Sequence, residues 1–488
     1  MPLITKVREL GMRTESRQNS IFFGKRVHFI GIGGCGMSGL ASVLLDAGAV
    51  VSGTDAKASA VTIGLAERGA RVSYAQDGTM LDRGIDLVVR TAAIPEQNRE
   101  YRRACDLGLN QAKYAQLLGQ VMRERMGIAV SGTHGKTTTT SMVSLALLEK
   151  GADPSFVIGG TVKQLGGSSR SGRGAPFVVE ACEFDRSFHN YHPKVAVITN
   201  IDEDHVDFYK KGLEEIIESF EAFARLVPPD GLIIANGKDE NTLRALRGIQ
   251  TRIEWVGEDD VETLDWAVRD TGLSGGCHTG DVFHCGQLVA RLRLSVPGRH
   301  NLFNATAAIA ACAAAGLSPA DAAEAIGRFE GADRRMAPLG RTNGAIVVDD
   351  YGHHPTEIRT TLEALREKYS VRAPARLICV FQPHQHSRTR SLLREFGEAF
   401  GGADIVVMPD VYAARDSDED RRSVSSADVV RLINRNGGNA VHMPQLGDAA
   451  EHVRLIARPG DVIVTMGAGN VWEVGCMLVG MKLGKEVA

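Results

Sequence analysis

Short apolar runs alternate with helix-length amphipathic segments along most of the chain. The runs have the length of buried strands, and most of them end in a polar or glycine-containing turn. They occupy residues 27–30, 50–53, 87–89, 127–130, 177–180, 195–198, 231–234, 345–348, 377–380, 405–408 and 462–465. Strands that alternate with helices in this way predict an α/β protein built on parallel sheets.

The same pattern divides the chain into three units after a leading segment. Residues 250–296 interrupt the alternation, and residues 288–294 alternate apolar with polar side chains, which predicts a small antiparallel section. The length of 488 residues also suggests three domains at roughly 150 residues each. We therefore predict an extension at 1–24 and domains at 25–126, 127–328 and 329–488.

Composition is that of an ordinary globular protein and gives no signal of nucleic-acid or membrane binding. Hydrophobic residues make up 43% and charged residues 24%, and the net charge of −3 provides no basic surface. The alanine-rich run at 305–317 is too short to span a bilayer and predicts a packed helix. The start of the chain has no leader-like apolar stretch, and the eight cysteines form no C-x-x-C pair. We therefore expect reduced thiols and a cytoplasmic protein.

The most specific motif lies at residues 131–140, which read Ser-Gly-Thr-His-Gly-Lys-Thr-Thr-Thr-Thr directly after an apolar run. Backbone N–H groups and the helix dipole attract a phosphate at such a strand-to-helix turn. Lys136 can bind the β- and γ-phosphates of ATP, and the Thr137 hydroxyl can bind Mg²⁺. Position 130 is valine where the Walker pattern has glycine, so the loop is a shorter variant; a turn without a ligand is the alternative. The predicted ATP-binding residues here are Gly132, Thr133, His134, Gly135, Lys136, Thr137 and Thr138.

A second glycine-rich loop follows the first predicted strand. Gly31, Gly33 and Gly36 match G-x-G-x-x-G, and Asp55 ends the next strand about 20 residues later, at the spacing of an acid that binds a ribose hydroxyl. The motif favours a bound diphosphate, which belongs to a nicotinamide or flavin cofactor or to a sugar nucleotide. Two such loops predict two phosphate-bearing ligands in two domains. The candidate residues for this second ligand are Gly31, Gly33, Gly34, Gly36, Met37, Asp55, Thr91 and Ala92.

Acidic residues cluster after two of the central strands. Residues 180–185 contain three carboxylates, and residues 202–205 read Asp-Glu-Asp-His. Carboxylates at the end of a parallel sheet beside a phosphate loop suit Mg²⁺ on ATP, so we choose Glu180 as a ligand. His205 is a candidate for a second metal or a phosphoryl oxygen, and the alternative is a surface histidine that Asp204 hydrogen-bonds. We expect the other carboxylates to be solvated, to cap helices, or to act as outer partners, which hold the residues that bind the ligand.

Six motifs in order resemble those of the Mur ligases. They are Gly-Thr-His-Gly-Lys-Thr-Thr at 132–138, Glu-Ala-Cys-Glu at 180–183, Thr-Asn-Ile-Asp-x-Asp-His at 199–205, Gly-Arg-His-Asn-x-x-Asn at 298–304, Asp-Asp-Tyr-Gly-His-His-Pro at 349–355 and Gln-Pro-His at 382–384. The resemblance covers nearly the whole chain. It implies a Rossmann-like UDP-sugar domain at 25–126, a P-loop-type ATPase domain at 127–328 and an α/β amino-acid-binding domain at 329–488.

The resemblance also implies a reaction. Members similar to this chain use ATP to join L-alanine to the carboxylate of UDP-N-acetylmuramate through an acyl phosphate, in peptidoglycan precursor synthesis. A relative that reattaches a recovered murein tripeptide to the same nucleotide shares most motifs, but Tyr351-Gly352 favours the alanine-adding activity. An NAD-dependent oxidoreductase that uses the 31–36 loop is the alternative from another class. A monomer or a homodimer is expected.

By resemblance, several further residues acquire roles. The implied catalytic residues are Lys136, Glu180, His205, His353 and Arg388, with Thr137, Glu180 and His205 as metal ligands. Asn301 and Asn304 would contact ATP near the adenine, unless they only cap a helix. One of Arg334 and Arg335, which we take as Arg335, would reach the ATP phosphates, and the other would be a solvated charge. His354 and His384 are equally compatible with structural and functional roles. Gln385 stands where the family has arginine, and neither Lys210 nor Lys211 is assigned as a carbamylated residue.

Overall fold

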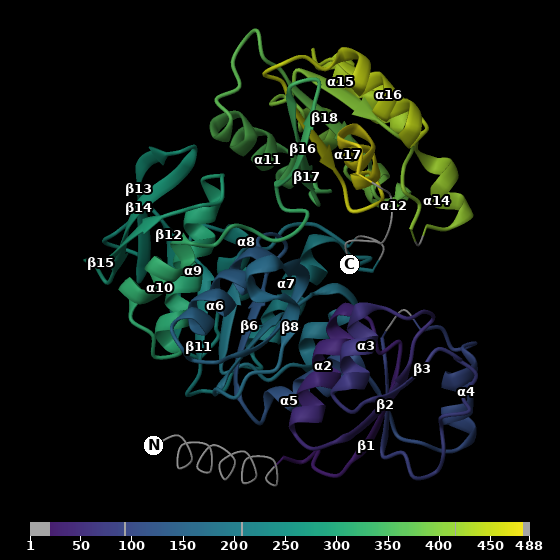
Figure 1. Ribbon diagram of the computed structural model, residues 1–488. Helices are drawn as coiled ribbons and strands as arrows, with labels where there is room; N and C mark the ends of the chain where they lie inside the picture. Colours follow the sequence, from purple (N-terminus) through teal and green to yellow (C-terminus); the bar gives the residue numbers. More distant parts are fainter. Residues whose placement is uncertain (1–19, 92–93, 206–207, 415, 482–488) are drawn as a thin grey trace, which may run out of the picture.

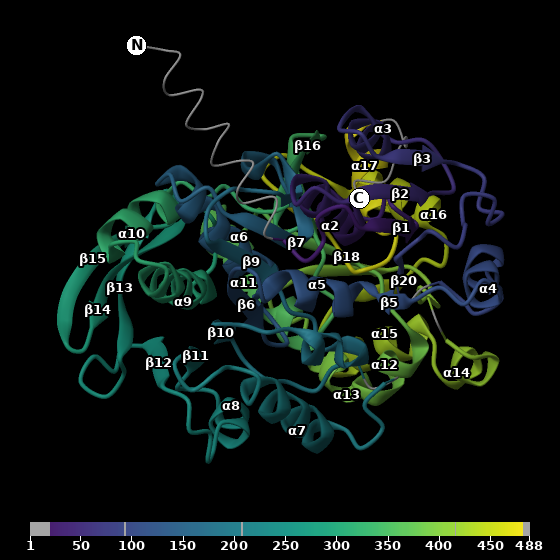
Figure 2. The same cartoon turned by 90° about the horizontal axis from the view of Figure 1, so that it is seen from below.

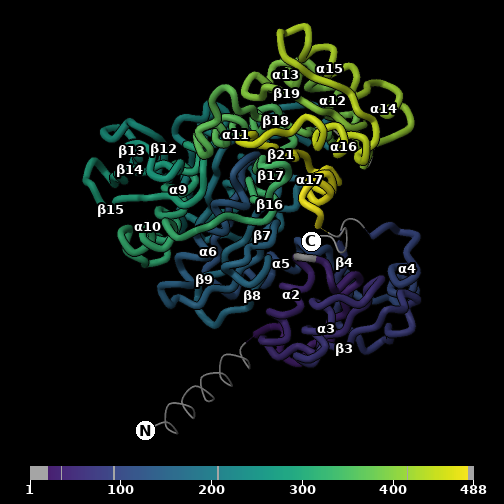
Figure 3. The backbone as a smooth tube through the Cα atoms, turned by 45° about the horizontal axis from the view of Figure 1, so that its top comes forward, coloured from purple at the N-terminus to yellow at the C-terminus, as the bar shows by residue number. Residues whose placement is uncertain are grey.

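The structure is a computed structural model that describes residues 20–91, 94–205, 208–414 and 416–481. Within these ranges the strands form three sheets, which Figure 1 shows as three bodies coloured purple to blue, teal, and green to yellow. Figure 3 shows the purple and yellow bodies separately beside the central one. We call them the N-terminal, central and C-terminal units. No helix in the described ranges has the length and apolar character needed to cross a bilayer.

The N-terminal unit is a parallel five-stranded sheet in the order β3-β2-β1-β4-β5. This order reverses direction at β1, so the loop after β1 opens at the crevice where doubly wound folds bind ligands. The expected Rossmann-like topology is therefore present. Its elements are β1 (Arg26–Ile30), α2 (Cys35–Asp46), β2 (Val50–Thr54), α3 (Ala60–Glu67), β3 (Arg71–Ser73), β4 (Leu87–Arg90), α4 (Arg99–Asp106), β5 (Gln111–Lys113) and α5 (Tyr114–Met122).

The central unit is built on a ten-stranded sheet in the order β15-β14-β13-β12-β11-β10-β6-β9-β7-β8. Its elements are β6 (Met126–Ser131), α6 (Lys136–Glu149), β7 (Ser155–Val162), β8 (Gly167–Arg170), β9 (Pro176–Glu180), β10 (Val195–Ile198), α7 (Leu213–Ala224), β11 (Leu232–Asn236), α8 (Glu240–Ala245), β12 (Ile253–Glu258), β13 (Trp266–Ser274), β14 (Cys277–His284), β15 (Gln287–Arg293), α9 (His300–Ala314) and α10 (Pro319–Gly327). The alanine-rich run forms the buried helix α9, as predicted.

The predicted antiparallel section is smaller than expected and continues the central sheet. β12 pairs in parallel with β11 and β13, and antiparallel pairing begins only at β13 with β14 and β15. Figure 2 shows these strands at the edge of the molecule far from the N-terminal unit. A glycine pair, Gly275-Gly276, makes the tight turn between β13 and β14 that reverses the chain direction.

The C-terminal unit is a six-stranded sheet in the order β16-β17-β21-β18-β19-β20, parallel except for the β16–β17 pair. Its elements are β16 (Ala337–Thr342), β17 (Ala345–Asp350), α11 (Pro355–Lys368), β18 (Leu377–Phe381), α12 (His386–Ser391), α13 (Leu393–Glu398), β19 (Ile405–Met408), α14 (Asp418–Ser423), α15 (Ser426–Arg435), β20 (Ala440–His442), α16 (Leu446–Ile456), β21 (Val462–Met466) and α17 (Trp472–Val479). Each sheet lies within one predicted domain, except that β6 begins one residue early; the domain boundaries themselves stay a prediction.

The two interfaces of the central unit differ in chemistry. One apolar cluster joins α2 and α5 of the N-terminal unit to β7 and β9 of the central unit, through residues such as Leu40, Leu118, Val157 and Phe177. The clusters of the C-terminal unit contain only residues of that unit. At the site described next, its contacts with the central unit include charged and polar pairs such as Arg388 with Asp204 and Glu357 with His134.

Candidate functional site

The loop between β6 and α6 has the form expected of a phosphate-binding turn. Gly135 precedes α6 with φ +83°, a left-handed conformation that glycine adopts without strain. A Cβ at this position would also lie 2.6 Å from Asn304 Oδ1 on α9, so both the backbone and the neighbouring helix require glycine. His134 N–H donates to Asn200 Oδ1 at 2.9 Å, which ties the loop to the end of β10. The turn leaves the start of α6 open toward a cavity.

Lys136 is buried and ion-paired within the loop. Its Nζ lies 3.0 Å from Glu183 Oε1 and donates to the carbonyls of Gly132 and Thr133 at 2.5 and 3.1 Å. Burial alone would lower the pKa of Lys136, but the charge of Glu183 outweighs burial and the pKa is raised. The lysine is therefore cationic at neutral pH. Of the three roles expected for this carboxylate, the structure favours that of an outer partner, because the Glu183 side chain is buried and pairs with Lys136.

Thr137 and Glu180 meet at the start of α6, as the sequence predicts. Thr137 Oγ1 donates to Glu180 Oε1 at 3.0 Å, and the N–H of Gly159 on β7 donates to Glu180 Oε2 at 2.6 Å. A hydroxyl and a carboxylate are hard oxygen donors of the kind that Mg²⁺ prefers. The pair therefore fits a magnesium ion, and Gly159 fixes the carboxylate orientation.

His205 lies apart from that pair and contacts other carboxylates. Its Nε2 is 3.6 Å from Glu183 Oε1 and 3.9 Å from Asp204 Oδ2, while its buried Nδ1 has no hydrogen-bond partner among the described residues. The predicted metal ligands therefore separate into the Thr137–Glu180 pair and a His205–Glu183 contact. Glu183 links His205 to Lys136, which precedes Thr137 in α6. The side chain of His205 is 19% exposed, so it is not the surface histidine of the alternative.

Asp204 joins the central unit to the predicted catalytic residues of the C-terminal unit. Arg388 of α12 donates to Asp204 Oδ1 through Nε at 2.9 Å and Nη2 at 2.8 Å, and His353 Nε2 lies 3.7 Å from Oδ2. Burial would raise the pKa of Asp204, but the Arg388 guanidinium and the neighbouring histidines hold it well below its usual value. Asp204 is thus buried and charged. Of the roles expected for this carboxylate, the contacts favour that of an outer partner.

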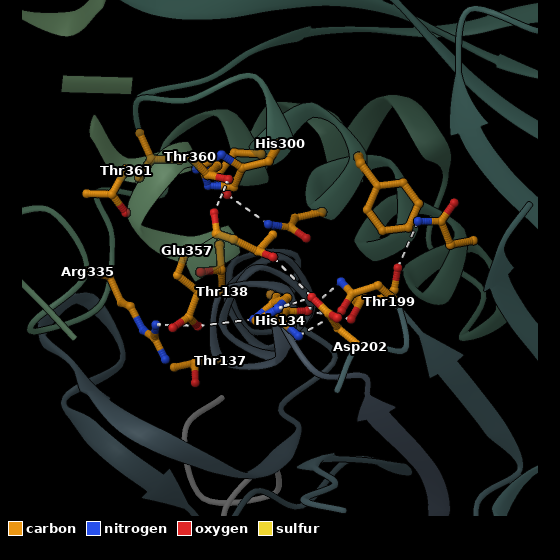
Figure 4. A pocket seen from close by; sticks show the side chains of 18 of the residues that line it. His134, Thr137, Thr138, Thr199, Asp202, His300, Arg335, Glu357, Thr360 and Thr361 are labelled. Atoms are coloured by element: carbon orange, nitrogen blue, oxygen red, sulfur yellow. Dashed lines mark hydrogen bonds and ion pairs between the residues drawn. The ribbon is translucent and has the colours of Figure 1, made fainter. Parts of the chain in front are cut away.

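A cavity of about 790 Å³ lies between the central and C-terminal units, beside the phosphate loop. Figure 4 shows Thr137 and Thr138 on one side of it, and Arg335, Glu357, Thr360 and Thr361 around it. Arg335 lies 4.0 Å from Glu357 Oε1. The other candidate, Arg334, donates to Asp349 Oδ2 at 3.1 Å and to the carbonyl of Gly467 at 2.7 Å, so it is not a solvated charge.

The far end of the cavity is formed by the start of α9. Asn301 and Asn304 line it together with His300, whose pKa burial lowers to about 4, so its ring is neutral at neutral pH. Asn304 Nδ2 donates to Asn301 Oδ1 at 2.9 Å, and Asn301 Nδ2 donates to the carbonyl of Pro297 at 2.7 Å. Arg299 occupies the N-cap position, so the capping alternative is wrong for both asparagines.

His134 lies where the two units meet at the cavity. Its Nε2 is 3.3 Å from Asp202 Oδ2, and its Nδ1 is 3.3 Å from Glu357 Oε1 on α11 (Figure 4). Burial would lower the pKa of His134, but the two carboxylates outweigh burial and raise the pKa to about 9. His354 caps α11 and is 4% exposed.

The second predicted ligand site lies at the crevice of the N-terminal unit. The N–H of Gly33 donates to Asp55 Oδ2 at 2.8 Å, which brings the predicted acid onto the glycine loop. Gly36 is required because a Cβ there would lie 2.6 Å from the hydroxyl of Tyr114. The Met37 side chain is buried in the apolar core and lies beside Gly34 of the glycine loop. Gly31 and Gly34 belong to the same turn, Thr91 directly follows β4, and Ala92 lies outside the described residues.

Three family models match the three units in order. They are described as Mur ligase family, catalytic domain (residues 26–126), Mur ligase middle domain (130–312) and Mur ligase, glutamate ligase domain (334–469). The chain belongs to the Mur ligase family. Mur ligases are ATP-dependent enzymes, so the ligase and ATP predictions are confirmed at this level.

Individual Mur ligases are similar over nearly the whole chain. Relatives named UDP-N-acetylmuramate–L-alanine ligase, from Caldanaerobacter subterraneus subsp. tengcongensis and Acetivibrio thermocellus, are each 41% identical, over 92% and 93% of this chain and 96% of theirs. The crystal structure of UDP-N-acetylmuramate-alanine ligase from Thermotoga maritima has a TM-score of 0.74 at 27% identity, covering 93% of this chain and 98% of that one. That of a murein peptide ligase from Psychrobacter arcticus has a TM-score of 0.67 at 27% identity, covering 94% and 98%.

Sequence reasoning missed three carboxylates of this site. Glu183, Asp202 and Glu357 hold Lys136 and His134 in place. Glu183 and Asp202 belong to acidic runs, and nothing in the sequence distinguishes these two partners of Lys136 and His134 from the other members. Glu357 follows Pro355 by two residues at the start of α11, where a glutamate is the expected capping-box residue and signals no contact with another unit. Gln385, the departure from the family pattern, is buried at the start of α12, and Lys210 and Lys211 are exposed.

Proposed function

We propose that this chain uses ATP to join L-alanine to the carboxylate of UDP-N-acetylmuramate, giving UDP-N-acetylmuramoyl-L-alanine, ADP and phosphate. The observation that carries the proposal is 41% identity to ligases of that name over 92% of the chain. Two phosphate-type loops on two units support it, because the reaction needs a nucleotide at each. The nicotinamide alternative explains only the first loop and leaves the second without a role.

The phosphoryl step is assigned to the residues around α6. We propose that the γ-phosphate of ATP lies against Lys136 and the loop N–H groups, while Thr137 and Glu180 hold Mg²⁺. The sugar carboxylate attacks this phosphate, the bond from Pγ to the bridging β-phosphate oxygen breaks, and ADP leaves; the resulting acyl phosphate is a good acyl donor, which the free carboxylate is not. Mg²⁺ bound there would neutralise charge on the phosphates, and Lys136 supplies the other positive charge that this transfer requires. His205 is the residue we propose for a second cation.

The amide-forming step is assigned to the C-terminal unit. The L-alanine amine attacks the acyl carbonyl, and phosphate leaves through a tetrahedral intermediate. We propose that His353 and Arg388 face this centre, because both converge on Asp204 beside the phosphate loop. Arg388 would bind a carboxylate or phosphate by two parallel hydrogen bonds, whereas in this structure its Nε and Nη2 both contact Asp204 Oδ1. Asn301, Asn304 and Arg335 would hold the rest of ATP in the cavity that they line.

The uridine diphosphate is assigned to the crevice of the N-terminal unit. Gly31, Gly33, Gly34 and Gly36 would bind the diphosphate through their loop, with Asp55 and Thr91 beside it and Ala92 and the backbone of Met37 nearby. We place the reaction in the cytoplasm because the described cysteines are free thiols. A monomer or homodimer suffices, since one chain supplies both nucleotide sites.

The alternative is ligation of a recovered murein tripeptide to the same nucleotide. The similarity to the murein peptide ligase of Psychrobacter arcticus supports it, at the same 27% identity as the Thermotoga maritima enzyme but with a lower TM-score. Both reactions share the ATP and sugar-nucleotide sites and differ only in the amine.

Phosphate release from ATP in the presence of UDP-N-acetylmuramate tests the proposal directly. The assay should be run with L-alanine, glycine, L-serine and the tripeptide L-alanyl-γ-D-glutamyl-meso-diaminopimelate, with each product identified by mass. We expect L-alanine to give the highest kcat/KM. Turnover with the tripeptide alone would favour the recycling reaction, and turnover with none of the four amines would refute both.

A further inference from the structure

Three side chains converge on one point at the interface between the central and C-terminal units. Asp202 Oδ2 lies 3.3 Å from His134 Nε2 and 3.7 Å from His354 Nδ1. All three ligand-type atoms lie within 4.8 Å of one another. His134 and Asp202 belong to the central unit, whereas His354 precedes α11 of the C-terminal unit. We call this group the interface triad.

The outer nitrogen of each histidine ring already has an oxygen partner. His134 Nδ1 faces Glu357 Oε1 at 3.3 Å, and His354 Nε2 faces the carbonyl of Glu203 at 3.2 Å. The N–H of Thr356 donates to His354 Nδ1 at 3.3 Å, so the outer nitrogen carries the proton, and a cation bound at Nδ1 would replace this helix-capping hydrogen bond. Metal-binding histidines are oriented in this way, with the far N–H held by a carboxylate or a carbonyl.

We propose that the interface triad binds one divalent transition-metal cation of the Zn²⁺ type. Ligands at about 2.0–2.1 Å in tetrahedral geometry stand about 3.4 Å apart, which is close to the spacing of Asp202 from the two ring nitrogens. Two imidazoles and one carboxylate favour zinc, cobalt or nickel over magnesium, which prefers oxygen ligands. A water or a phosphate oxygen would take the fourth position. The cation replaces the proton between His134 Nε2 and Asp202, and that proton is released to solvent.

This site is separate from the magnesium site assigned to Thr137 and Glu180. Its ligands come from two units, so a bound cation ties α11 to the phosphate loop. The cavity lies between these units, and its lining includes His134 and Asp202. Zn²⁺ bound here would therefore oppose separation of the two units at the cavity.

The test is a titration of the full chain with Zn²⁺ by isothermal calorimetry, without nucleotides or amino acid and with Mg²⁺ in excess to saturate oxygen-ligand sites. Co²⁺ is the spectroscopic probe, because its visible bands report nitrogen and oxygen ligands in tetrahedral geometry and separate them from thiolate ligation. His354→Gln and Asp202→Asn each remove one ligand with little change in volume. His452→Gln, on α16 of the same unit, is the matched control.

We expect one equivalent of Zn²⁺ to bind to the wild type and to His452→Gln. Loss of an outer partner of a metal site already costs about 10- to 100-fold in affinity, so loss of a ligand should raise the Kd by about 100-fold or more in each triad variant. Unchanged affinity in both triad variants, cobalt bands of thiolate type, or an equal loss in the control would overturn the proposal. Because no substrate is present, failure here leaves the proposed ligase activity untouched, and the reverse also holds.

Discussion

Removal of the Lys136 ammonium separates its structural role from its catalytic one. Lys136→Met keeps much of the side-chain volume but leaves Glu183 as a buried charge. The two side chains are 13% and 3% exposed and 3.0 Å apart, and Glu183 Oε2 has no hydrogen-bond partner among the described residues. Breaking such a buried pair from one side costs about 3–5 kcal/mol, because the remaining charge is desolvated without compensation.

The magnitude can be measured as a shift of the unfolding midpoint. At about 2–4 °C per kcal/mol for a domain of roughly 200 residues, a loss of about 3 kcal/mol lowers the Tm of the central unit by about 6–12 °C. The fluorescence of Trp255 and Trp266, both in the central unit, reports this transition. Lys150→Met is the control at the other end of α6, where the lysine pairs with the exposed carboxylates of Asp321 and Glu324. Its midpoint should stay within experimental error of the wild type.

A second substitution then distinguishes the two roles. In Lys136→Met/Glu183→Gln the unpaired charge is gone, so most of the lost stability should return, while phosphate release should stay absent because nothing replaces the ammonium at the phosphates. A single Lys136→Met variant as stable as the wild type would refute the ion-pair argument. Recovery of turnover in the double variant would refute the assignment of Lys136 to ATP.

Three further predictions concern other parts of the site. Gly135→Ala would place a left-handed alanine against Asn304, so holding the loop in its binding conformation should cost about 1–2 kcal/mol. This cost should raise the KM for ATP about 5- to 30-fold, and an unchanged KM for ATP would contradict the argument. Asp55→Ala should raise the KM for UDP-N-acetylmuramate about tenfold and leave that for ATP unchanged, and equal effects on both would argue against separate nucleotide sites. Burial raises the pKa of Asp350 from 3.8 to about 6. The protonated side chain therefore contributes stability that is fully present at pH values below the pKa of the unfolded chain, and this contribution is lost as pH rises through about 6. Urea titrations should therefore show that the free energy of unfolding of the wild type, relative to that of Asp350→Asn, falls by up to about 3 kcal/mol between about pH 4 and pH 8, at about 1.4 kcal/mol per pKa unit. A difference between the two proteins that does not change with pH would refute the pKa shift.

Much of the site could be predicted because parallel sheets bring strand ends together. Glu180 ends β9, which pairs with β6, and β6 leads into the loop that contains Thr137. A strand-end carboxylate next to a phosphate loop therefore has to meet the start of the following helix, and the structure contains the Thr137–Glu180 contact. The order of apolar runs and glycines was sufficient for this step, without knowledge of the other units.

The contacts between units could not be predicted in the same way. His134 and Glu357 are 223 residues apart in sequence, and Arg388 and Asp204 are 184 apart. No periodicity links such positions, and a carboxylate in an acidic turn is normally solvated. Burial of Asp204 follows only from the docking of the C-terminal unit, which is a property of the whole chain. Local sequence reasoning therefore named candidate groups but left solvated, helix-capping and outer-partner roles open for the carboxylates that the next unit covers.

The chemistry of the two interfaces indicates which unit moves during turnover. The N-terminal unit shares an apolar cluster with the central unit, and separating them would expose side chains such as Leu118 and Phe177 to water. The C-terminal unit meets the central unit at the site through charged pairs such as Arg388–Asp204, and water can solvate both partners when they separate. Opening at this second interface therefore exposes less apolar surface to water than opening at the first. It also uncovers the cavity that ATP must enter. We infer that the C-terminal unit opens and closes over ATP, and that its arginine and histidines approach the reacting groups only on closure, when water that would hydrolyse an acyl phosphate is excluded.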